Sequence, residues 1–296
     1  MIKKIKKAIM PVAGLGTRFL PVTKSQPKEM LPIVDKPVLQ YLVEEAVASG
    51  IEEIIIVTGR GKRNIEDYFD HSFELEYNLV EKGREDLLAE VKKIANLAKI
   101  AYVRQPMPLG DGHAILCAAH LVHDEPVAVL FGDDIIDAQK PALAQMIEVY
   151  EQKQAPILCI QQVAEHRISS YGIIDPEGQE GNVYKVKGMV EKPKVEDAPS
   201  NLGIVGKYII TPEVFDCLLE AKPSAGGEIR LIDGFRKMLE KGSPIYAYQF
   251  EGKRYDTGDK FGLIKATIDF ALKREDLGPK VLEYIKKIAE HGGVGK

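Results

Sequence analysis

Tryptophan is absent from the 296-residue sequence, and cysteine occurs only three times, as Cys117, Cys159 and Cys217. These cysteines are odd in number, lie far apart and form no C-x-x-C pair, so neither a disulfide framework nor a cysteine zinc site is supported. We therefore expect buried, reduced thiols in a cytoplasmic protein.

Long apolar runs are also missing. No stretch approaches the roughly 20 apolar residues that a membrane-spanning helix needs. The lysine-rich start and the apolar run behind it look like a secretory signal, but the run meets Gly14, Gly16 and Arg18 too soon. We expect no association with a membrane.

The sequence has no large excess of charge of either sign. Forty Lys and Arg residues against 44 Asp and Glu residues give a formal charge of -4. This balance lacks the basic footprint of a dedicated nucleic-acid binder, so we expect no nucleic-acid partner. Any anionic ligand must then be bound by local positive charge.

Short apolar runs alternate with helical patterns in the first half of the chain, which is typical of a parallel sheet covered by helices. The predicted strands are Ile9 to Ala13, Ile54 to Thr58, Ile100 to Val103 and Val127 to Phe131. The predicted helices are residues 38–49, 84–98, 112–121 and 141–152.

From Pro156 the pattern changes to a mixed sheet. Strand-like runs cover residues 157–163, 172–174, 183–190, 202–210 and 245–250, with a polar turn at Asp175-Pro-Glu-Gly. Helical segments cover residues 212–219 and 228–240, and two closing helices start at Lys260 and Pro279. We predict a Rossmann-like α/β fold with a mixed, mainly parallel central sheet flanked by helices and a smaller substrate-binding β elaboration.

The first predicted strand runs into a glycine-rich turn, where α/β proteins often bind phosphates. Gly14 and Gly16 resemble the opening of a dinucleotide-binding turn, but Phe19 stands at the third glycine position and Pro21 follows it. The phosphate loop of common NTPases is missing too. Instead, the turn is followed by cationic side chains that can neutralise a polyphosphate, namely Arg18, Lys24 and Lys28.

A set of motifs in order from residue 8 to about residue 270 closely resembles the sugar-1-phosphate nucleotidylyltransferases, and among them the bacterial enzymes that use UTP and glucose 1-phosphate. The motifs are Gly14-Leu-Gly-Thr-Arg-Phe-Leu-Pro, Pro27-Lys-Glu-Met-Leu-Pro, Gly110-Asp-Gly-His-Ala, Phe131-Gly-Asp-Asp, Val190-Glu-Lys-Pro, Ser200-Asn-Leu-Gly and Tyr255-Asp-Thr-Gly. Asp111 and Arg230 depart from the family pattern, which has an apolar residue and more often a Gln at these positions.

Asp133 follows a strand of buried type, so it lies at a strand end, where open α/β sheets place their ligands. The resemblance implies that Asp133 and Asp256 hold one Mg²⁺ ion, and two carboxylates are enough for Mg²⁺ when phosphate oxygens and water complete its shell. Asp134 is the rival of Asp133 and ranks behind it.

The resemblance also assigns the remaining contacts. It places Arg18 on the pyrophosphate, Lys28 on the UTP phosphates and Lys192 on the sugar phosphate, as the catalytic residues. The nucleotide-binding positions are Ala13, Gly14, Gly16, Gln105 and Gly110, with Gln105 and Gly110 on the uracil edge. The sugar-binding positions are Gly172, Glu191, Asn201 and Gly203. We expect His113 to be a packing or helix-face residue.

The reaction implied is direct, Mg²⁺-assisted in-line transfer of a uridylyl group from UTP to α-D-glucose 1-phosphate, giving UDP-glucose and pyrophosphate. A thymidylyl- or cytidylyltransferase and a non-catalytic nucleotide-sugar sensor remain as alternatives. A nicotinamide-dependent oxidoreductase is disfavoured by the first turn. Because no linker is visible, we expect one domain over residues 1–296. Its parts are a nucleotide-binding half (1–155), a sugar-binding part (156–260) and C-terminal helices (261–296). We also expect a homo-oligomer, either a dimer or a tetramer.

Overall fold

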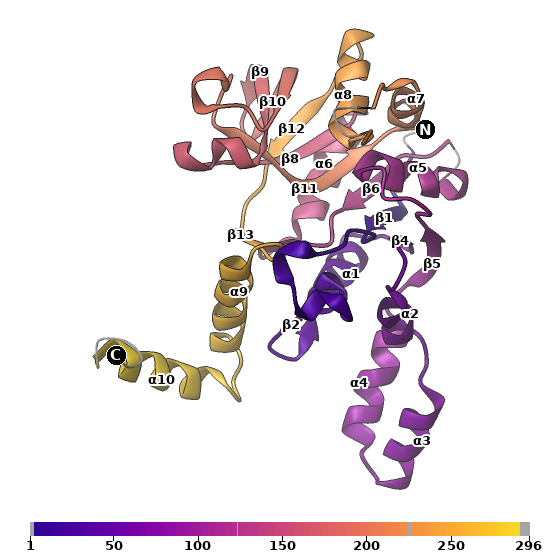
Figure 1. Cartoon of the computed structure of the whole chain (residues 1–296), viewed down its shortest axis with the longest axis vertical. Coiled ribbons are helices and arrows are strands. Elements are labelled where there is room, and N and C mark those ends of the chain that lie inside the picture. Colours follow the sequence, from indigo (N-terminus) through magenta and orange to yellow (C-terminus); the bar gives the residue numbers. More distant parts are fainter. Residues whose placement is uncertain (1–2, 123, 224–226, 291–296) are drawn as a thin grey trace.

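The computed structural model describes residues 3–122, 124–223 and 227–290 (Figure 1). Part of the expected C-terminal segment, residues 291–296, lies outside the described ranges. At the centre of the molecule is a nine-stranded sheet with the strand order β5-β4-β1-β6-β11-β8-β12-β10-β9. Strands from both halves of the chain therefore share one sheet.

The strands of the first half are parallel, as the sequence predicts. They are β1 (Lys7–Pro11), β4 (Glu53–Thr58), β5 (Lys99–Arg104) and β6 (Val127–Leu130). Their pairings β1–β4, β1–β6 and β4–β5 all run parallel. Continuous Ile, Val and Ala runs suit strands that are covered on both faces. The carboxyl ends of these strands consequently meet at one edge of the sheet.

The second half extends the sheet with mixed pairings. The strands are β8 (Ile157–Gln162), β9 (Gly172–Glu180), β10 (Val183–Glu191), β11 (Leu202–Ile210) and β12 (Tyr246–Gln249). β11 pairs antiparallel with both β6 and β8, whereas β12 and β8 run parallel. The predicted turn at Asp175 is wrong: β9 continues through it, because a β-bulge opposite Val186 absorbs the irregular Pro-Glu-Gly sequence.

Two short ladders lie outside the main sheet. One joins β7 (Asp134–Asp137) to β13 (Lys253–Asp256), with Asp134 opposite Asp256. The other joins β2 (Pro32–Ile33) to β3 (Lys36–Pro37). The first ladder brings the two acidic motifs of the sequence together across a gap of more than a hundred residues.

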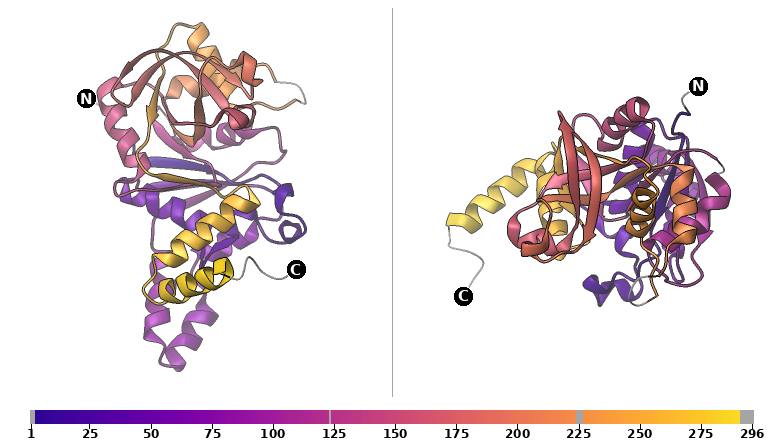
Figure 2. Two further views of the ribbon diagram at one scale, coloured as in Figure 1. Left: turned by 90° about the vertical axis from the view of Figure 1, so that its left-hand side faces the viewer. Right: turned by 90° about the horizontal axis from the view of Figure 1, so that it is seen from above.

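The helices cover both faces of the sheet, and two helical arms project from the same end of the molecule (Figures 1 and 2). The helices are α1 (Val38–Ala48), α2 (Arg63–Phe69), α3 (Phe73–Glu81), α4 (Glu85–Ala95), α5 (Asp111–Val122), α6 (Ala142–Lys153), α7 (Pro212–Glu220), α8 (Leu231–Glu240), α9 (Lys260–Leu272) and α10 (Gly278–Glu290). None of the helices in the described ranges is long and apolar enough to span a bilayer.

Two of these helices, α2 and α3, have no counterpart in the sequence-based prediction. α3 projects from the body with α4 and buries only Leu79, whereas Phe73 is 78% exposed. A helix that packs so little against the core has no marked apolar face, so its sequence lacks the amphipathic period from which a helix is predicted. α8 begins at Leu231, three residues after the predicted start, because the Arg230 N–H donates to the Asp233 side chain there.

The apolar core consists of one layer on each face of the sheet. On one face, α1 and α6 pack with residues such as Leu39, Leu42 and Met146; on the other, α5, α7 and α8 pack with residues such as Ile115, Leu218 and Phe235. This arrangement of helices on both faces confirms the predicted α/β class.

A wholly buried cation lies between one of these layers and the sheet. The Lys207 side chain on β11 is 0% exposed, and its ammonium donates to Glu45 Oε2 at 2.7 Å and to the Asp134 carbonyl oxygen at 2.9 Å. Glu45 Oε1 in turn accepts from the Leu143 N–H at 3.1 Å. Lys207 therefore connects the middle of the sheet to α1, α6 and the start of β7.

We expect Lys207→Met to lower the free energy of unfolding by about 3–5 kcal/mol, because the change leaves the Glu45 carboxylate buried without its cation. The measurement is chemical denaturation. Lys237→Met is the matched control, since Lys237 forms an exposed pair with Glu240, and it should change stability by no more than about 0.5 kcal/mol. Equal losses of unfolding free energy in the two variants would show that the buried Lys207–Glu45 pair stabilises the protein no more than an exposed pair does.

Candidate active site

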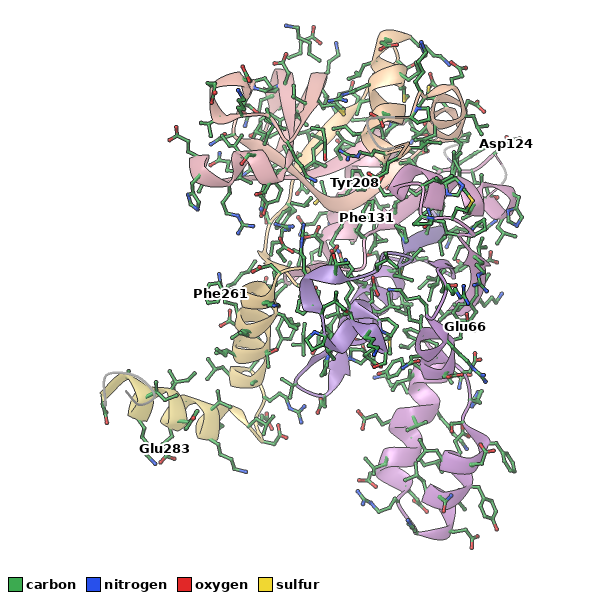
Figure 3. All side chains as sticks on the ribbon, viewed as in Figure 1. Glu66, Asp124, Phe131, Tyr208, Phe261 and Glu283 are labelled. Atoms are coloured by element: carbon green, nitrogen blue, oxygen red, sulfur yellow. The ribbon has the colours of Figure 1, made fainter. Side chains whose placement is uncertain are left out.

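Two adjoining cavities open at the carboxyl edge of the parallel strands, with volumes of about 420 and 520 Å³. The first lies against β9, β10 and α8, and the second lies against the glycine-rich turn and the start of α5. Both are lined by Arg18, Asp111, Phe131, Asp133, Glu191 and Arg230. The aromatic ring of Phe131, edge-on to Tyr208 with centroids 5.6 Å apart, lies near the centre of the molecule (Figure 3).

The turn after β1 is built from short 3₁₀ segments rather than from a helix. Gly16 has a φ of 66°, and a Cβ there would lie 3.1 Å from Thr23 and 3.2 Å from Lys28. The Thr23 hydroxyl donates to the Gly16 carbonyl at 2.8 Å, which closes the loop. Ala13 and Gly14 are left lining the second cavity, with Arg18 beside both cavities.

Lys28 and Asp133 form the ion pair that connects this loop to the end of β6. The Lys28 ammonium lies 2.6 Å from Asp133 Oδ2. Burial on its own would raise the pKa of the Asp133 carboxyl, but Lys28, assisted by Arg254 and Arg18, outweighs it and holds that pKa below its usual value. Asp133 therefore stays ionised and presents a carboxylate to both cavities.

The neighbouring carboxylate, Asp134, is fully used within the protein. Its Oδ2 accepts from the Gly206 N–H at 2.7 Å, and its Oδ1 pairs with the Arg254 guanidinium. Both side chains of that ion pair are 9% exposed. The Asp134 side chain is therefore a structural anchor, which leaves Asp133 as the better candidate for binding a cation.

The turn after β13 brings Asp256 to the same place. The Thr257 N–H and hydroxyl donate to the Asp133 carbonyl at 2.8 and 2.9 Å, so the turn packs directly on Asp133. Asp256 Oδ2 lies 3.9 Å from Arg254 and 3.7 Å from Arg167. Burial raises the pKa of Asp256, the carboxylates of Asp134 and Asp133 add to that rise, and Arg254 opposes it.

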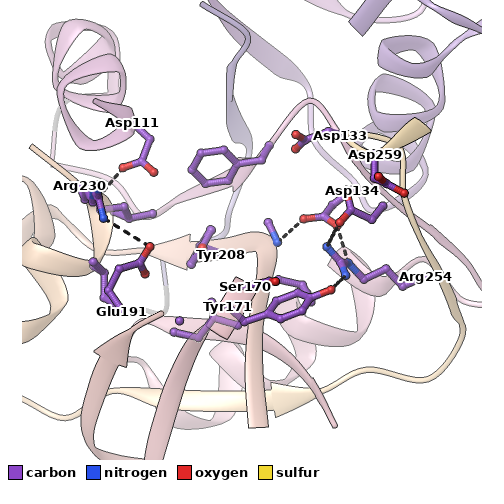
Figure 4. Close-up of a pocket in the computed structure, with 18 of the residues that line it drawn as sticks. Asp111, Asp133, Asp134, Ser170, Tyr171, Glu191, Tyr208, Arg230, Arg254 and Asp259 are labelled. Carbon is purple, nitrogen blue, oxygen red and sulfur yellow. Dashed lines mark hydrogen bonds and ion pairs between the residues drawn. The ribbon is translucent and has the colours of Figure 1, made fainter. Parts of the chain in front are cut away.

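Glu191 ends β10 and lines both cavities, and Figure 4 shows it across the first cavity from Asp133; Lys192 follows it and lines the second cavity. Glu191 Oε1 lies 3.6 Å from the Lys192 ammonium and 3.6 Å from Arg230 Nη1. Its Oε2 faces the hollow at Gly172, where a Cβ would lie only 3.2 Å from that oxygen. One oxygen is thus held by cations while the other is turned toward the cavity wall.

Asp111 and Arg230, the two departures from the family pattern, connect the two cavities. Asp111 Oδ1 accepts from the Leu231 N–H at 2.7 Å, and Arg230 bridges Glu191 and Glu228, with its Nη2 3.2 Å from Glu228. Burial raises the pKa of the Asp111 carboxyl. Figure 4 shows Asp111, Arg230 and Glu191 on one side of the first cavity, opposite Asp133 and Arg254.

Gln105 and Gly110 form a small unit in the second cavity. Gly110 has a φ of 101°, and a Cβ there would lie 2.4 Å from the Ile229 carbonyl oxygen. The Gln105 amide nitrogen donates to the Gly110 carbonyl at 2.9 Å and lies 3.1 Å from His113 Nδ1. His113, expected only to pack, is therefore in polar contact with a proposed base-reading residue.

The sequence-predicted residues divide into two groups in the structure. Those that line one or both cavities are Ala13, Gly14, Arg18, Lys28, Gln105, Gly110, Asp133, Gly172, Glu191, Lys192 and Asp256. Three others stand behind the walls of these cavities: Gly16 shapes the loop, Gly203 packs against Val163 and Tyr171, and the Asn201 carbonyl accepts from the Val163 N–H at 2.9 Å.

Three side chains of the first cavity have no counterpart in the sequence-based prediction. Arg254 lies on β13, and the Tyr171 hydroxyl accepts from it at 2.8 Å and from Arg167 at 3.1 Å. Their partners lie 4 to 120 positions away in the sequence, and no local motif points to them. The only available signal is that Arg254 is adjacent to Tyr255-Asp-Thr-Gly and Tyr171 to Gly172.

The glycine-rich turn at the end of a parallel strand, the paired acidic residues and the cationic rim define a nucleotidyl-transferring site. The chain belongs to the nucleotidyl transferase family, whose model matches residues 7–272. This confirms the resemblance that the motifs carry.

Similar proteins point to one kind of nucleotidyl transferase. UTP–glucose-1-phosphate uridylyltransferase of Bacillus subtilis is 54% identical over 96% of this chain and 97% of its own length, and the uridylyltransferase 2 of Staphylococcus saprophyticus is 53% identical over 97% and 99%. A UTP-bound UGPase from Acinetobacter baumannii superposes with a TM-score of 0.89 at 42% identity, covering 96% of this chain and 99% of that one. A UDP-glucose pyrophosphorylase complexed with UDP-glucose gives 0.83 at 46% identity, covering 91% and 100%.

Because both carboxylate oxygens of Asp134 are held within the protein, a substitution of Asp134 should lower its stability. We expect Asp134→Asn to lower the free energy of unfolding by about 3 kcal/mol, because it leaves the Arg254 guanidinium buried without its carboxylate. Asp137→Asn is a control on the same strand, where the partner Lys273 is exposed, and should cost less than about 1 kcal/mol. Thermal and denaturant unfolding measure both, and a control as unstable as Asp134→Asn would contradict the assignment.

Proposed function

We infer that the protein transfers a uridylyl group from UTP to α-D-glucose 1-phosphate, giving UDP-glucose and pyrophosphate. The observation that carries this inference is the pair of adjoining cavities, which share Arg18, Asp133 and Glu191 at their border. Joining a nucleotide to a sugar phosphate requires two such sites that meet, and because both reactants are anions, the two cations among the shared lining residues, Arg18 and Arg230, are suited to the phosphates. Relatives named for this activity at 54% and 53% identity support the same conclusion.

The second cavity is proposed to bind UTP. Ala13 and Gly14 lie where backbone can approach the nucleotide, and Gly16 sets the shape of that loop. Gln105 and Gly110 are assigned to the edge of the uracil ring. The glycines of this lining leave backbone accessible to a flat base, and Arg18 and Lys28 beside them supply charge for its phosphates.

The first cavity is proposed to bind the sugar phosphate. Glu191 Oε2 faces the Gly172 hollow and can accept hydrogen bonds from glucose hydroxyls. Lys192, which lines the second cavity beside Glu191, is assigned to the phosphate of the sugar, where the two cavities adjoin. Asn201 and Gly203 support this wall from behind, through Val163 and Tyr171.

The chemistry is an in-line displacement at the α-phosphorus of UTP. An oxygen of the sugar phosphate forms the new P–O bond as the bond to pyrophosphate breaks. This oxygen is already ionised, so no general base is needed, and the enzyme must supply positioning and charge stabilisation. We assign Arg18 to the departing pyrophosphate, Lys28 to the UTP phosphates and Lys192 to the attacking phosphate.

The family is generally dependent on a divalent metal, and we propose Mg²⁺ held by Asp133 and Asp256. The structure supports the fit: Thr257 holds the turn of Asp256 against Asp133, and neither carboxylate is saturated as Asp134 is. The described part of the chain has no cluster of three or more potential ligands, and Mg²⁺ needs only one or two carboxylates when substrate phosphates are present. When bound, the ion supplies positive charge beside the phosphates.

We further propose that residues 1–296 form one domain, with a nucleotide-binding half (1–155), a sugar-binding part (156–260) and C-terminal helices (261–296). The proposal rests on the continuous nine-stranded sheet, which contains strands from the first two parts. We also propose that the protein works in the cytoplasm and as a homo-oligomer. The exposed apolar residues of the arms, such as Phe73 and Phe261, favour self-association.

The experiment that tests the proposed function measures pyrophosphate release with each nucleoside triphosphate at fixed glucose 1-phosphate. We expect the order UTP, then dTTP, then CTP in kcat/KM, with purine triphosphates poorest because a two-ring base overfills the site. The extra methyl of dTTP is worth only about 1–3 kcal/mol, and discrimination against dTTP exceeds this only if the site also reads the ribose 2′-hydroxyl that dTTP lacks, whereas a reversed hydrogen-bonding edge costs more. A preference for dTTP or CTP would replace the uridylyl assignment by one of the two rival transferases, and no turnover with any triphosphate would favour the sensor.

The proposed metal site is tested by a Mg²⁺ titration of the rate. Asp133→Asn and Asp256→Asn should each raise the Mg²⁺ concentration needed for half-maximal rate by about tenfold or more, since each removes one of few anionic ligands. Asp137→Asn, which changes a carboxylate on β7 away from the cavities, should leave the titration curve in place. Unshifted curves for both site variants would remove these residues from metal binding.

A further inference from the structure

We propose that His113 is a positioning residue that fixes the side-chain amide of Gln105 with its oxygen free, and thereby makes the base site select uracil over cytosine. This inference deepens the proposed function and rests on it. It is carried by the two contacts of the Gln105 amide nitrogen, with the Gly110 carbonyl at 2.9 Å and with His113 Nδ1 at 3.1 Å.

The orientation of the amide follows from the first contact. An amide side chain has one end that donates and one end that accepts, and its orientation is assigned from its partners. A backbone carbonyl can only accept, so the end of Gln105 that faces the Gly110 oxygen must be the NH₂ group. The flipped amide would place two oxygens against each other.

The second contact settles the state of the imidazole. With one amide proton on the Gly110 carbonyl, the other points at His113 Nδ1, which must then be an acceptor. The contact thus corresponds to the His113 tautomer that accepts at Nδ1 and carries its ring proton on Nε2. The Cys117 thiol, 4.0 Å from the same nitrogen, is compatible with a lone pair there.

The imidazole is itself held in place by the fold. His113 lies in the first turn of α5, and its backbone N–H donates to the Ile229 carbonyl at 3.3 Å. Gln105 follows β5 directly, and its N–H donates to the Thr58 carbonyl at 2.8 Å. Both residues are thus fixed by backbone contacts, so the side-chain contact between them has little freedom to change.

With both amide protons used, the atom of Gln105 left for a ligand is Oε1. Within the described residues no donor contacts this oxygen, and Gln105 lines the second cavity. An acceptor matches the N3–H of uracil, whereas cytosine has a lone pair at N3. Gln105 therefore offers the base an acceptor and no donor, because both protons of its amide are already used.

Loss of the His113 acceptor would free one amide proton and leave the Gly110 carbonyl as the one group among the described residues that holds this orientation, so the preference for it would weaken. A rotated amide would present its NH₂ group, which matches N3 of cytosine. His113 therefore affects which base is accepted, and it does so through Gln105 rather than by contacting the sugar or the phosphates.

The test compares two isosteric replacements. His113→Asn can place Oδ1 close to the position of Nδ1 and keeps an acceptor, whereas His113→Leu has a similar size and no acceptor. For each variant, kcat/KM is measured with UTP and with CTP, together with KM for glucose 1-phosphate. His120→Leu, on the same helix but at an exposed position, is the control for losing a histidine from α5.

We expect His113→Leu to lower the UTP-to-CTP ratio of kcat/KM by about tenfold or more, because a site that reads hydrogen bonds loses its fixed acceptor. His113→Asn and His120→Leu should keep the ratio within about twofold of the unmodified protein, and KM for glucose 1-phosphate should stay constant in all three, because no contact with the sugar side changes. If His113→Leu does not fold, His113→Ala removes the same acceptor with less bulk.

An unchanged ratio in a folded, active His113→Leu or His113→Ala protein would overturn the inference, and so would an equal loss in His113→Asn. These outcomes are distinct from failure of the proposed function. That failure appears in the unmodified protein, as a preference for another triphosphate or as no turnover at all.

Discussion

The ion pair between Lys28 and Asp133 is the interaction on which the geometry of the site depends. It joins the glycine-rich turn after β1 to the end of β6, two segments 105 positions apart in the sequence, at 2.6 Å. The backbone carbonyl of Asp133 also accepts two hydrogen bonds from Thr257. The glycine-rich turn, the segment after β6 and the turn of Asp256 thus meet at one residue.

Ion pairs of this kind recur across both cavities, because the described cations that line them, apart from Arg18, lie beside carboxylates. Lys192 and Arg230 lie beside Glu191, and Arg254 pairs with Asp134. A group of unpaired cations would repel one another and destabilise the fold, whereas alternating charges can be held close together. Under the proposed function, substrate phosphates would compete with these carboxylates for cations that are already in position.

The sequence predicts the parallel half of the fold well, because buried strands and the amphipathic helix α1 leave strong local patterns. It does not predict α3, which packs against little, or the path of β9 through a Pro-Glu-Gly segment, where a bulge and the partner strand override local turn propensity. Pairing across the sheet is decided by tertiary contacts that no short window of sequence contains.

The residues of the site likewise divide into those that the sequence predicts and those that it does not. Asp133 can be placed from the strand before it, and the glycine-rich turn from its composition. Arg254 escapes prediction because its partner Asp134 lies 120 positions away. His113 escapes it for another reason: a histidine on a helix face is ordinarily a packing residue, and its importance depends on the orientation of an amide that only the folded structure fixes.

The turn at Gly110 packs closely on the segment before α8, and this packing limits how the sequence of such a protein can diverge. Gly110 and Gly112 leave no room for a Cβ against Ile229 and Arg230, at 2.4 and 2.8 Å. The same segment carries Arg230, which contacts Glu191 on the sugar side. A substitution that shifts this backbone on the side of the second cavity also displaces the wall of the first cavity. With the base and the sugar in these cavities as proposed, divergence toward a new nucleotide would be coupled to divergence toward a new sugar, and the two preferences would be inherited as a pair.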